Sequence, residues 1–239
     1  MKKVIAAALL LASCGALAEP ELPASYAGQD AEHWFQVVSG LSGGGLAALD
    51  GQRFTFAVDL ENSPGFSLDY DAKAGKATLL YRMAFNNVAE GWSWDTLADP
   101  ESADYYRYKF LPLKTVFEEK TPPVGAKRGV KSLWRYDYFV AFDNLYDFYP
   151  QQANDDAGFR AVIKLESAAL AENGRLGMLA VCRLKPPYHS ESDTFWKADL
   201  ADPVDYTLRK RYLMVELHEI WYFDTVSGKV LARLERLPR

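Results

Sequence analysis

The residues best suited to acid–base chemistry in this chain are its three histidines and the acids beside two of them. Glu216 and His218 lie two residues apart in a strand-like stretch, so they share one face with Tyr212 and Ile220. A Glu–His pair can move protons or hold a metal, but this spacing offers no third ligand. The favoured interpretation is a partly exposed polar pair on a solvent face.

A second group of reactive side chains lies in residues 188–193, which place His189 among two hydroxyls and two carboxylates. A catalytic triad needs side chains brought together from separate segments, which one short stretch does not provide. A weakly held cation is one interpretation of this stretch, and a solvated polar loop is the simpler one. We therefore expect no metal site and no cofactor.

Motifs of the common enzyme classes are missing from the sequence. It contains no GxSxG elbow, HExxH pair, P-loop, dinucleotide fingerprint, EF-hand loop or CxxC pair. Residues 43–45 are three glycines followed by no Lys or Thr, which indicates a flexible joint rather than a phosphate loop. Cys182 lies in an apolar strand-like run, which predicts a buried and unreactive thiol. These features favour a non-enzymatic protein.

One enzymatic alternative stays open because acids are plentiful. Residues 86–104 carry two tryptophans and five acids with no basic residue. Paired carboxylates can hydrolyse a glycosidic bond, and their separation in space cannot be read from spacing along the chain. The candidates for such a pair are Asp95, Asp99 and Glu101, near Trp92 and Trp94.

The strongest binding signal is a basic segment in an acidic chain. Residues 120–131 hold four basic side chains and no acid, and their prolines and glycines predict a projecting loop. Most aromatic residues of such a chain fill a β core, whereas aromatic residues in loops can stack on sugars or form a protein interface. The candidate binding residues are Trp92, Trp94, Lys127, Arg128, Lys131, Tyr146, Phe148 and Trp196.

The first residues of the chain predict export from a bacterial cytoplasm. Two lysines precede a short apolar run, as in a secretory signal peptide. Cleavage after Ala18 removes residues 1–18, whereas cleavage before Cys14 removes residues 1–13 and leaves a lipidated cysteine. Both sites fit the residue types. The mature protein is then either free in the periplasm or tethered to a membrane through Cys14, and no transmembrane segment is expected.

Composition and hydrophobic spacing predict the fold. The chain has 239 residues, of which 49% are hydrophobic and 14% aromatic, and this excludes a disordered chain. Residues 19–49 read as a leader and an N-terminal helix capped by Asp30. Residues 50–239 read as a single mainly β domain (all-β or α+β), an antiparallel meander of about nine strands forming a barrel-like sheet or a sandwich.

The hydrophobic spacing also predicts one strand face and one loop within this meander. Alternation places Leu213, Val215, Leu217, Trp221 and Phe223 on one face of a late strand. The stretch from about residue 185 to 205 is polar and reads as a loop.

The function that these features favour is binding within a bacterial cell envelope. A net charge of −5, or −7 without the two N-terminal lysines, excludes a general attraction to nucleic acid. The expected partner is an envelope protein, a glycan or an anionic lipid surface. The alternatives are a periplasmic hydrolase that acts on a glycan through paired carboxylates, and a structural subunit of an envelope assembly.

Overall fold

The protein is mainly β in the part of the chain that its computed structural model describes. That part comprises residues 28–60, 63, 65–82, 108–121, 130–148, 158–164, 166–167, 169, 173–199, 201 and 203–237. Two short helices, α1 (Ala31–Gly40) and α2 (Gly44–Ala47), precede the first strand. The strands are β1 (Phe54–Val58), β2 (Phe66–Asp71), β3 (Lys76–Arg82), β4 (Lys109–Lys120), β5 (Lys131–Phe142), β6 (Gly158–Lys164), β7 (Leu176–Trp196), β8 (Val204–Asp224) and β9 (Val230–Glu235). None of the helices in these ranges has the length and apolar character that a membrane crossing requires.

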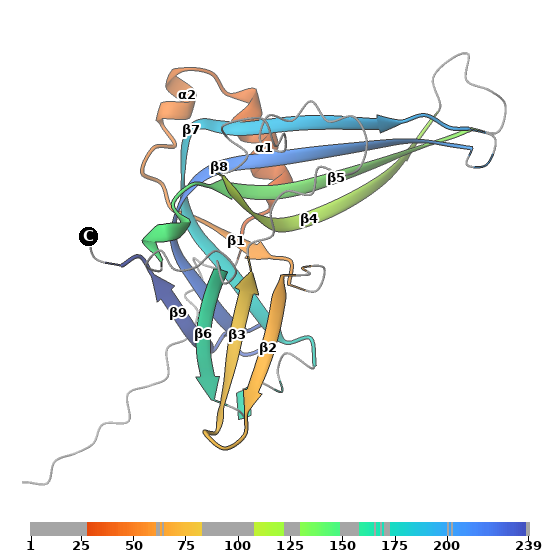
Figure 1. Ribbon diagram of the computed structural model, residues 1–239. Helices are drawn as coiled ribbons and strands as arrows, with labels where there is room; N and C mark the ends of the chain where they lie inside the picture. Colours follow the sequence, from red (N-terminus) through yellow and green to blue (C-terminus); the bar gives the residue numbers. More distant parts are fainter. Residues whose placement is uncertain are drawn as a thin grey trace, which may run out of the picture.

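The strands form two sheets (Figure 1). The larger sheet has the order β1-β7-β8-β5-β4, with β9 also paired to β8, and the smaller sheet has the order β2-β3-β6. The expected antiparallel meander is wrong in strand order, because β1 pairs with β7 and β3 pairs with β6. It is also wrong in direction at one place, because β5 and β8 pair in parallel. Nor is a closed barrel formed by the described strands. The edge strands β1 and β4 approach at one backbone hydrogen bond, from the Asp59 N–H to the Pro112 carbonyl (3.0 Å).

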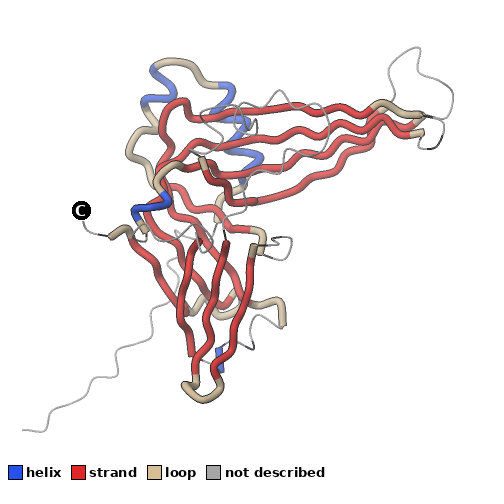
Figure 2. Tube along the Cα trace, in the orientation of Figure 1, coloured by secondary structure: helices blue, strands red, loops and turns tan. Residues whose placement is uncertain are grey.

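The two 21-residue strands β7 and β8 run through two parts of the molecule (Figures 1 and 2). Residues 189–196 of β7 and 204–213 of β8 join β4 and β5 in a long four-stranded extension, which we call the arm. The other halves of β7 and β8 join β1 and β9 and pack against the smaller sheet; we call this part the body.

The core of the body lies between the two sheets. Side chains at alternate positions of β3 and β6, such as Leu79 and Phe159, are almost fully buried and belong to one cluster with Phe54, Met178 and Tyr222 of the large sheet. From Phe159 onward, buried and exposed residues alternate along β6. In the first half of β7 every residue from 178 to 182 is buried, because Leu179 and Val181 pack in a second cluster on the opposite face.

The alternation of β8 changes at His218. Val181 of β7 lies opposite Glu219 and the next residue lies opposite Leu217, so His218 is an extra residue in β8. Such a bulge moves every later side chain to the other face. Leu217 and Ile220 therefore both lie in the main core, whereas Trp221 packs in a separate cluster on the opposite face. The expected face that combined Leu217 with Trp221 is wrong for this reason, and Ile220 does not share the exposed side of the Glu216–His218 pair.

The expected polar loop from about residue 185 is wrong as well, because β7 continues to Trp196. Leu184 pairs with Val215 and His189 pairs with Leu213, so residues 185–188 stand opposite the single residue Met214. This irregularity includes two prolines, which cannot donate hydrogen bonds to a ladder. Beyond this irregularity, β7 is an edge strand of the arm, and polar side chains are compatible with that position.

Helix α1 covers one face of the arm near the body. The Asp30 carboxylate accepts a hydrogen bond from the Glu32 N–H (3.0 Å), which confirms the predicted N-cap. Phe35 and Val38 are buried against the sheet. Helix α1 ends at Gly40, and Gly43, with a φ of 45°, lies in the expected break. Gly44 and Gly45 begin α2 and are not part of the joint.

Candidate interaction surface

The face of the arm that carries α1 is organised by strand register. Trp134, Tyr136 and Tyr138 alternate along β5, and the Phe35 ring of α1 packs edge-on against Tyr138 at 6.2 Å between centroids. Because β5 and β8 are parallel and in register at these positions, Arg209 lies beside Tyr136 and Arg211 beside Tyr138. This face therefore alternates rings with guanidinium groups across two strands.

Two cations flank the outermost ring of this face. The Lys120 Nζ lies 3.9 Å from the centroid of Trp134, and the guanidinium carbon of Arg209 lies 4.6 Å from it. Tyr136 stacks beside the same ring at 6.1 Å. Cation–π contacts of this kind stabilise by about 0.5–2 kcal/mol each. Trp134 is therefore anchored by its neighbours and is not an open platform for a sugar ring.

Each cation also has a carboxylate partner. Lys120 donates to the Tyr136 hydroxyl (2.8 Å), which raises the pKa of Lys120, and lies 3.4 Å from Glu118. Arg209 pairs with Asp193 at 2.9 Å. The cluster is thus built from matched charges that hold β4, β5, β7 and β8 together.

Arg211 links the strands to α1. Its side chain is only 9% exposed, and it pairs with Glu191 at 2.6 Å while its guanidinium lies 5.4 Å from the Phe35 ring. Strand geometry splits the polar stretch 188–193 between two faces, with His189 and Glu191 on the α1 side and Ser190 on the other. Since Arg211 and Arg209 engage its carboxylates, the structure gives no support to a cation site in this stretch.

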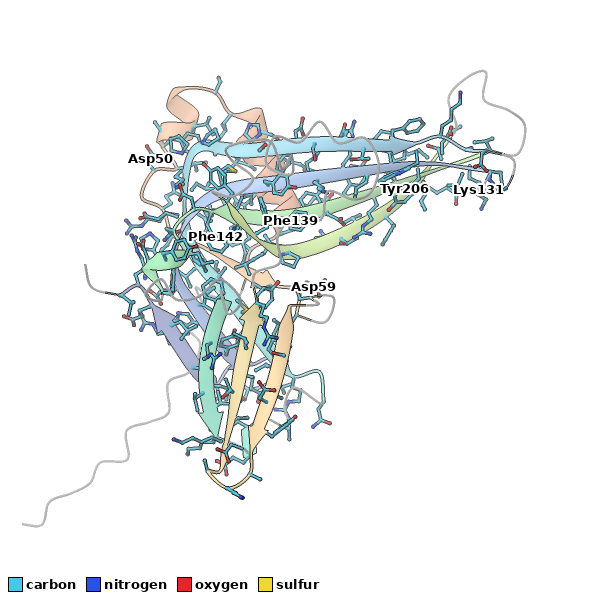
Figure 3. The ribbon with its side chains drawn as sticks, in the orientation of Figure 1. Asp50, Asp59, Lys131, Phe139, Phe142 and Tyr206 are labelled. Carbon is cyan, nitrogen blue, oxygen red and sulfur yellow. The ribbon has the colours of Figure 1, made fainter. Side chains whose placement is uncertain are left out.

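The far end of the arm carries two of the predicted binding residues (Figure 3). Lys131 begins β5 with a side chain that is 66% exposed, and its Nζ lies 3.8 Å from the exposed carboxylate of Glu119. Trp196 ends β7 and packs against Tyr206 at 5.3 Å between ring centroids. The structure therefore brings Lys131 and Trp196 to the same end of the arm, since β5, β7 and β8 all begin or end there.

Tyr146 and Phe148 lie elsewhere. They follow β5, and Figure 3 shows Phe142 at the opposite end of that strand from Lys131. Tyr146 is half exposed, whereas Phe148 packs edge-on against Phe159 of the core at 5.5 Å. The remaining predicted site residues, Trp92, Trp94, Lys127, Arg128 and the acylation candidate Cys14, lie outside the described residues, as do the hydrolase candidates Asp95, Asp99 and Glu101.

The Glu216–His218 pair belongs to an ion-pair network. His218 Nε2 lies 3.3 Å from Glu216, and burial lowers the pKa of His218. Arg236 donates to Glu216 (2.6 Å) and to Asp147 (2.7 Å), which ties the end of the chain to the residues after β5. Within the residues that the structure describes, no group of three or more His, Cys, Asp or Glu side chains is placed to hold a metal ion.

The most buried acids of the described chain are each paired with arginine. Asp137 contacts Arg135, Asp224 contacts Arg175, and Glu219 contacts both Arg53 and Arg233. Hydrogen bonds, first from Ser227 and then from Arg175, lower the pKa of Asp224 to about 2. Cys182 is fully buried and burial raises the pKa of its thiol, as expected for an unreactive cysteine.

A groove that sequence reasoning missed lies between α1 and β4. It has a volume of about 430 Å³. Helix α1 contributes Glu32 and Gln36, β4 contributes Val116 and Glu118, and β5 contributes Tyr136 and Tyr138. Burial and the nearby charge of Glu32 raise the pKa of Tyr138 to about 12. The groove depends on the packing of a helix across a sheet, for which the sequence carries no local signal.

Comparison with known proteins identifies no relative of this chain. No protein-family model matches it, and neither a curated protein nor a solved structure matches it.

Proposed function

We propose that this chain is an exported, non-enzymatic interaction protein of a bacterial cell envelope, which binds an anionic partner through the far end of the arm. In this proposal the two facing sheets act as a sandwich-like body from which the arm projects. The observation that carries the proposal is the placement of Lys131, with its largely exposed side chain, at the end of a four-stranded extension. β4 ends and β5 begins at this end, and the sequence between Lys120 and Lys131 contains Lys127 and Arg128.

The contacts of the arm support this role. The paired charges around Trp134 and Arg211 join all four strands side by side, so the far end is held by a rigid sheet. A rigid support reduces the conformational entropy that ordering a binding surface would cost. Among the described residues, Lys131 pairs by contrast with the exposed Glu119 at 3.8 Å. Such exposed pairs contribute little energy, so the cation stays available to a partner.

Hydrolysis by paired carboxylates stays the alternative, and its candidates Asp95, Asp99 and Glu101 lie outside the described residues. A glycosidase needs one carboxylic acid whose pKa is raised so that it can donate a proton. The most buried carboxylates in the described ranges lie against arginines instead, and a neighbouring guanidinium favours the ionised form.

The test neutralises the basic end of the arm by the triple substitution Lys127→Gln, Arg128→Gln and Lys131→Gln. The matched control replaces Lys73, Lys76 and Lys164 by Gln, which removes the same charge near the turn between β2 and β3, at the other end of the molecule. Binding is measured on an envelope extract and on vesicles with and without anionic lipid, over a salt series.

The two triple variants distinguish a specific site from a general charge effect. We expect the first to lose most of the binding and its salt dependence, and the control to retain both. Vesicle binding would identify anionic lipid as the partner, and binding from the extract alone would identify a protein or glycan. Equal binding by the wild type and the first variant at every salt concentration would overturn the proposal.

A further inference from the structure

In the described part of the chain, the outer edge of β4 is open along the second half of the strand. β4 pairs with β5 on one side, and at the other side the Pro112 carbonyl accepts the Asp59 N–H. A register irregularity lies between Pro112 and Lys114, after which β4 is regular to Lys120. No described strand pairs with the outer side of this regular segment. An edge of this kind presents backbone N–H and C=O groups to another strand.

Charged side chains often protect an edge strand from pairing, but not every side chain of this edge is charged. Phe117 is 62% exposed, although a cation, Arg135, lies 5.8 Å from its ring. On the other face, Lys114, Val116 and Glu118 alternate beside the tyrosines of β5. A large exposed ring on an open edge strand favours pairing with another chain.

The charges of the segment are self-complementary about Val116. If two copies of β4 pair antiparallel with a two-fold axis at Val116, Lys114 of each copy lies opposite Glu118 of the other. We propose that a second copy of this chain docks on this edge, so that the two arms form one continuous sheet across a symmetric dimer. This interaction is independent of the binding proposed for the far end of the arm.

Neighbouring registers lack this complementarity. An axis at Phe117 places Lys114 opposite Lys120, and an axis at Glu118 or Glu119 places that glutamate opposite its own copy. Like charges directly opposite each other destabilise a strand pair, whereas opposite charges stabilise it. An axis one residue earlier, at Thr115, places Lys114 opposite an uncharged side chain. Among these registers, the one centred on Val116 is therefore preferred.

The groove beside α1 fits the same arrangement. Side chains at paired positions point to the same face of a sheet, so Lys114 of the second copy lies on the α1 side, next to Glu118. The residues that line the groove include the carboxylates of Glu32 and Glu118 and no basic side chain. Within one copy Glu32 already pairs with Lys114 and Glu118 with Lys120. A lysine that enters from the second copy would share the exposed Glu118 carboxylate with Lys120, while Val116 of each copy packs on the other.

The experiment reverses the two charges of the proposed pair, singly and together, in the purified full chain. The variants are Lys114→Glu, Glu118→Lys and the double substitution, and the dimer dissociation constant is measured by sedimentation equilibrium. Because both symmetry-related pairs change from attraction to repulsion, each single reversal should weaken the dimer about tenfold or more. The double variant should dimerise with an affinity close to that of the wild type.

The double variant separates docking from local effects. Lys114 also contacts Glu32 at 2.8 Å, so Lys114→Glu disturbs α1 in any case, and circular dichroism checks that each variant folds. Lys114 and Glu118 are four residues apart on one strand, about 13 Å, which is too far for a contact within one copy. Recovery of the dimer dissociation constant in the double variant, when circular dichroism shows that the single variants fold like the wild type, therefore supports the contact between copies. A wild type that stays monomeric at every concentration, or a dimer that none of the reversals weakens, would overturn the proposal.

Discussion

The side-chain amide of Asn144 makes two hydrogen bonds with the backbone of Leu217, as a neighbouring strand would. Its nitrogen donates to the Leu217 carbonyl at 2.8 Å, and its oxygen accepts from the Leu217 N–H at 3.0 Å. β8 pairs with β5 up to Met214 and with β9 from Glu219 onward, so these two bonds lie in the gap between its successive partners. The same stretch contains the bulge at His218.

This contact predicts a measurable loss of stability in Asn144→Ala. The substitution leaves one backbone donor and one acceptor of a partly buried strand unpaired, which should cost about 2 kcal/mol in the free energy of unfolding. Urea denaturation measures the change. The matched control is Asn173→Ala, which removes an exposed hydrogen bond to Ala169 and should cost less than about 0.5 kcal/mol. Equal losses in both variants would contradict the role given to Asn144.

The buried guanidinium of Arg211 should stabilise the junction between α1 and the arm. Arg211→Met keeps much of the volume but removes the ion pair with Glu191 and the contact with Phe35. Since the Glu191 carboxylate is partly exposed and can be solvated, we expect Arg211→Met to lower the free energy of unfolding by about 1–2 kcal/mol. Arg211→Lys should lower it less. Arg183→Met, at an exposed position of β7, is the control and should change stability by less than about 0.5 kcal/mol. Unfolding in urea again provides the measurement, and no difference between the two Met variants would refute the prediction.

The pKa of Asp224 predicts how stability changes in acid. Its folded-state pKa is about 2 and its ordinary value is 3.8, so the ionised carboxylate favours the folded state. This contribution is complete above the ordinary value and is lost as the pH falls toward 2. Asp224→Asn should therefore be less stable than the wild type near neutral pH, and the gap between them should narrow below about pH 4. Denaturation curves at a series of pH values test this, with Asp69→Asn on exposed β2 as the control. A gap that stays constant down to pH 2 would show that the carboxylate charge is not responsible.

The two candidate cleavage sites predict different outcomes for Cys14→Ser. If signal processing occurs before Cys14, the substitution should abolish acyl labelling and release the protein from the membrane fraction, because the cysteine carries the acyl chains. Metabolic labelling and fractionation of cells measure both. Cys182→Ser is the control, since that thiol is buried and should carry no acyl chain. Membrane association that persists unchanged in Cys14→Ser would exclude lipid anchoring at this residue.

Local patterns in the sequence determined much of the fold. The N-cap at Asp30 and the break near Gly43 follow from nearest-neighbour geometry, and the mainly β character follows from hydrophobic spacing, which the chain records directly.

Only the tertiary structure determined how these strands pair and which face of each strand is buried. The bulge at His218 reverses the faces of β8, and the irregularity after Leu184 lets a polar segment continue as a strand, because each depends on what the neighbouring strand offers. The parallel register of β5 and β8, which sets Arg209 and Arg211 beside the rings of β5, joins segments about 70 residues apart. The groove beside α1 and the open edge at Val116 arise from the same long-range packing, and no local spacing encodes them.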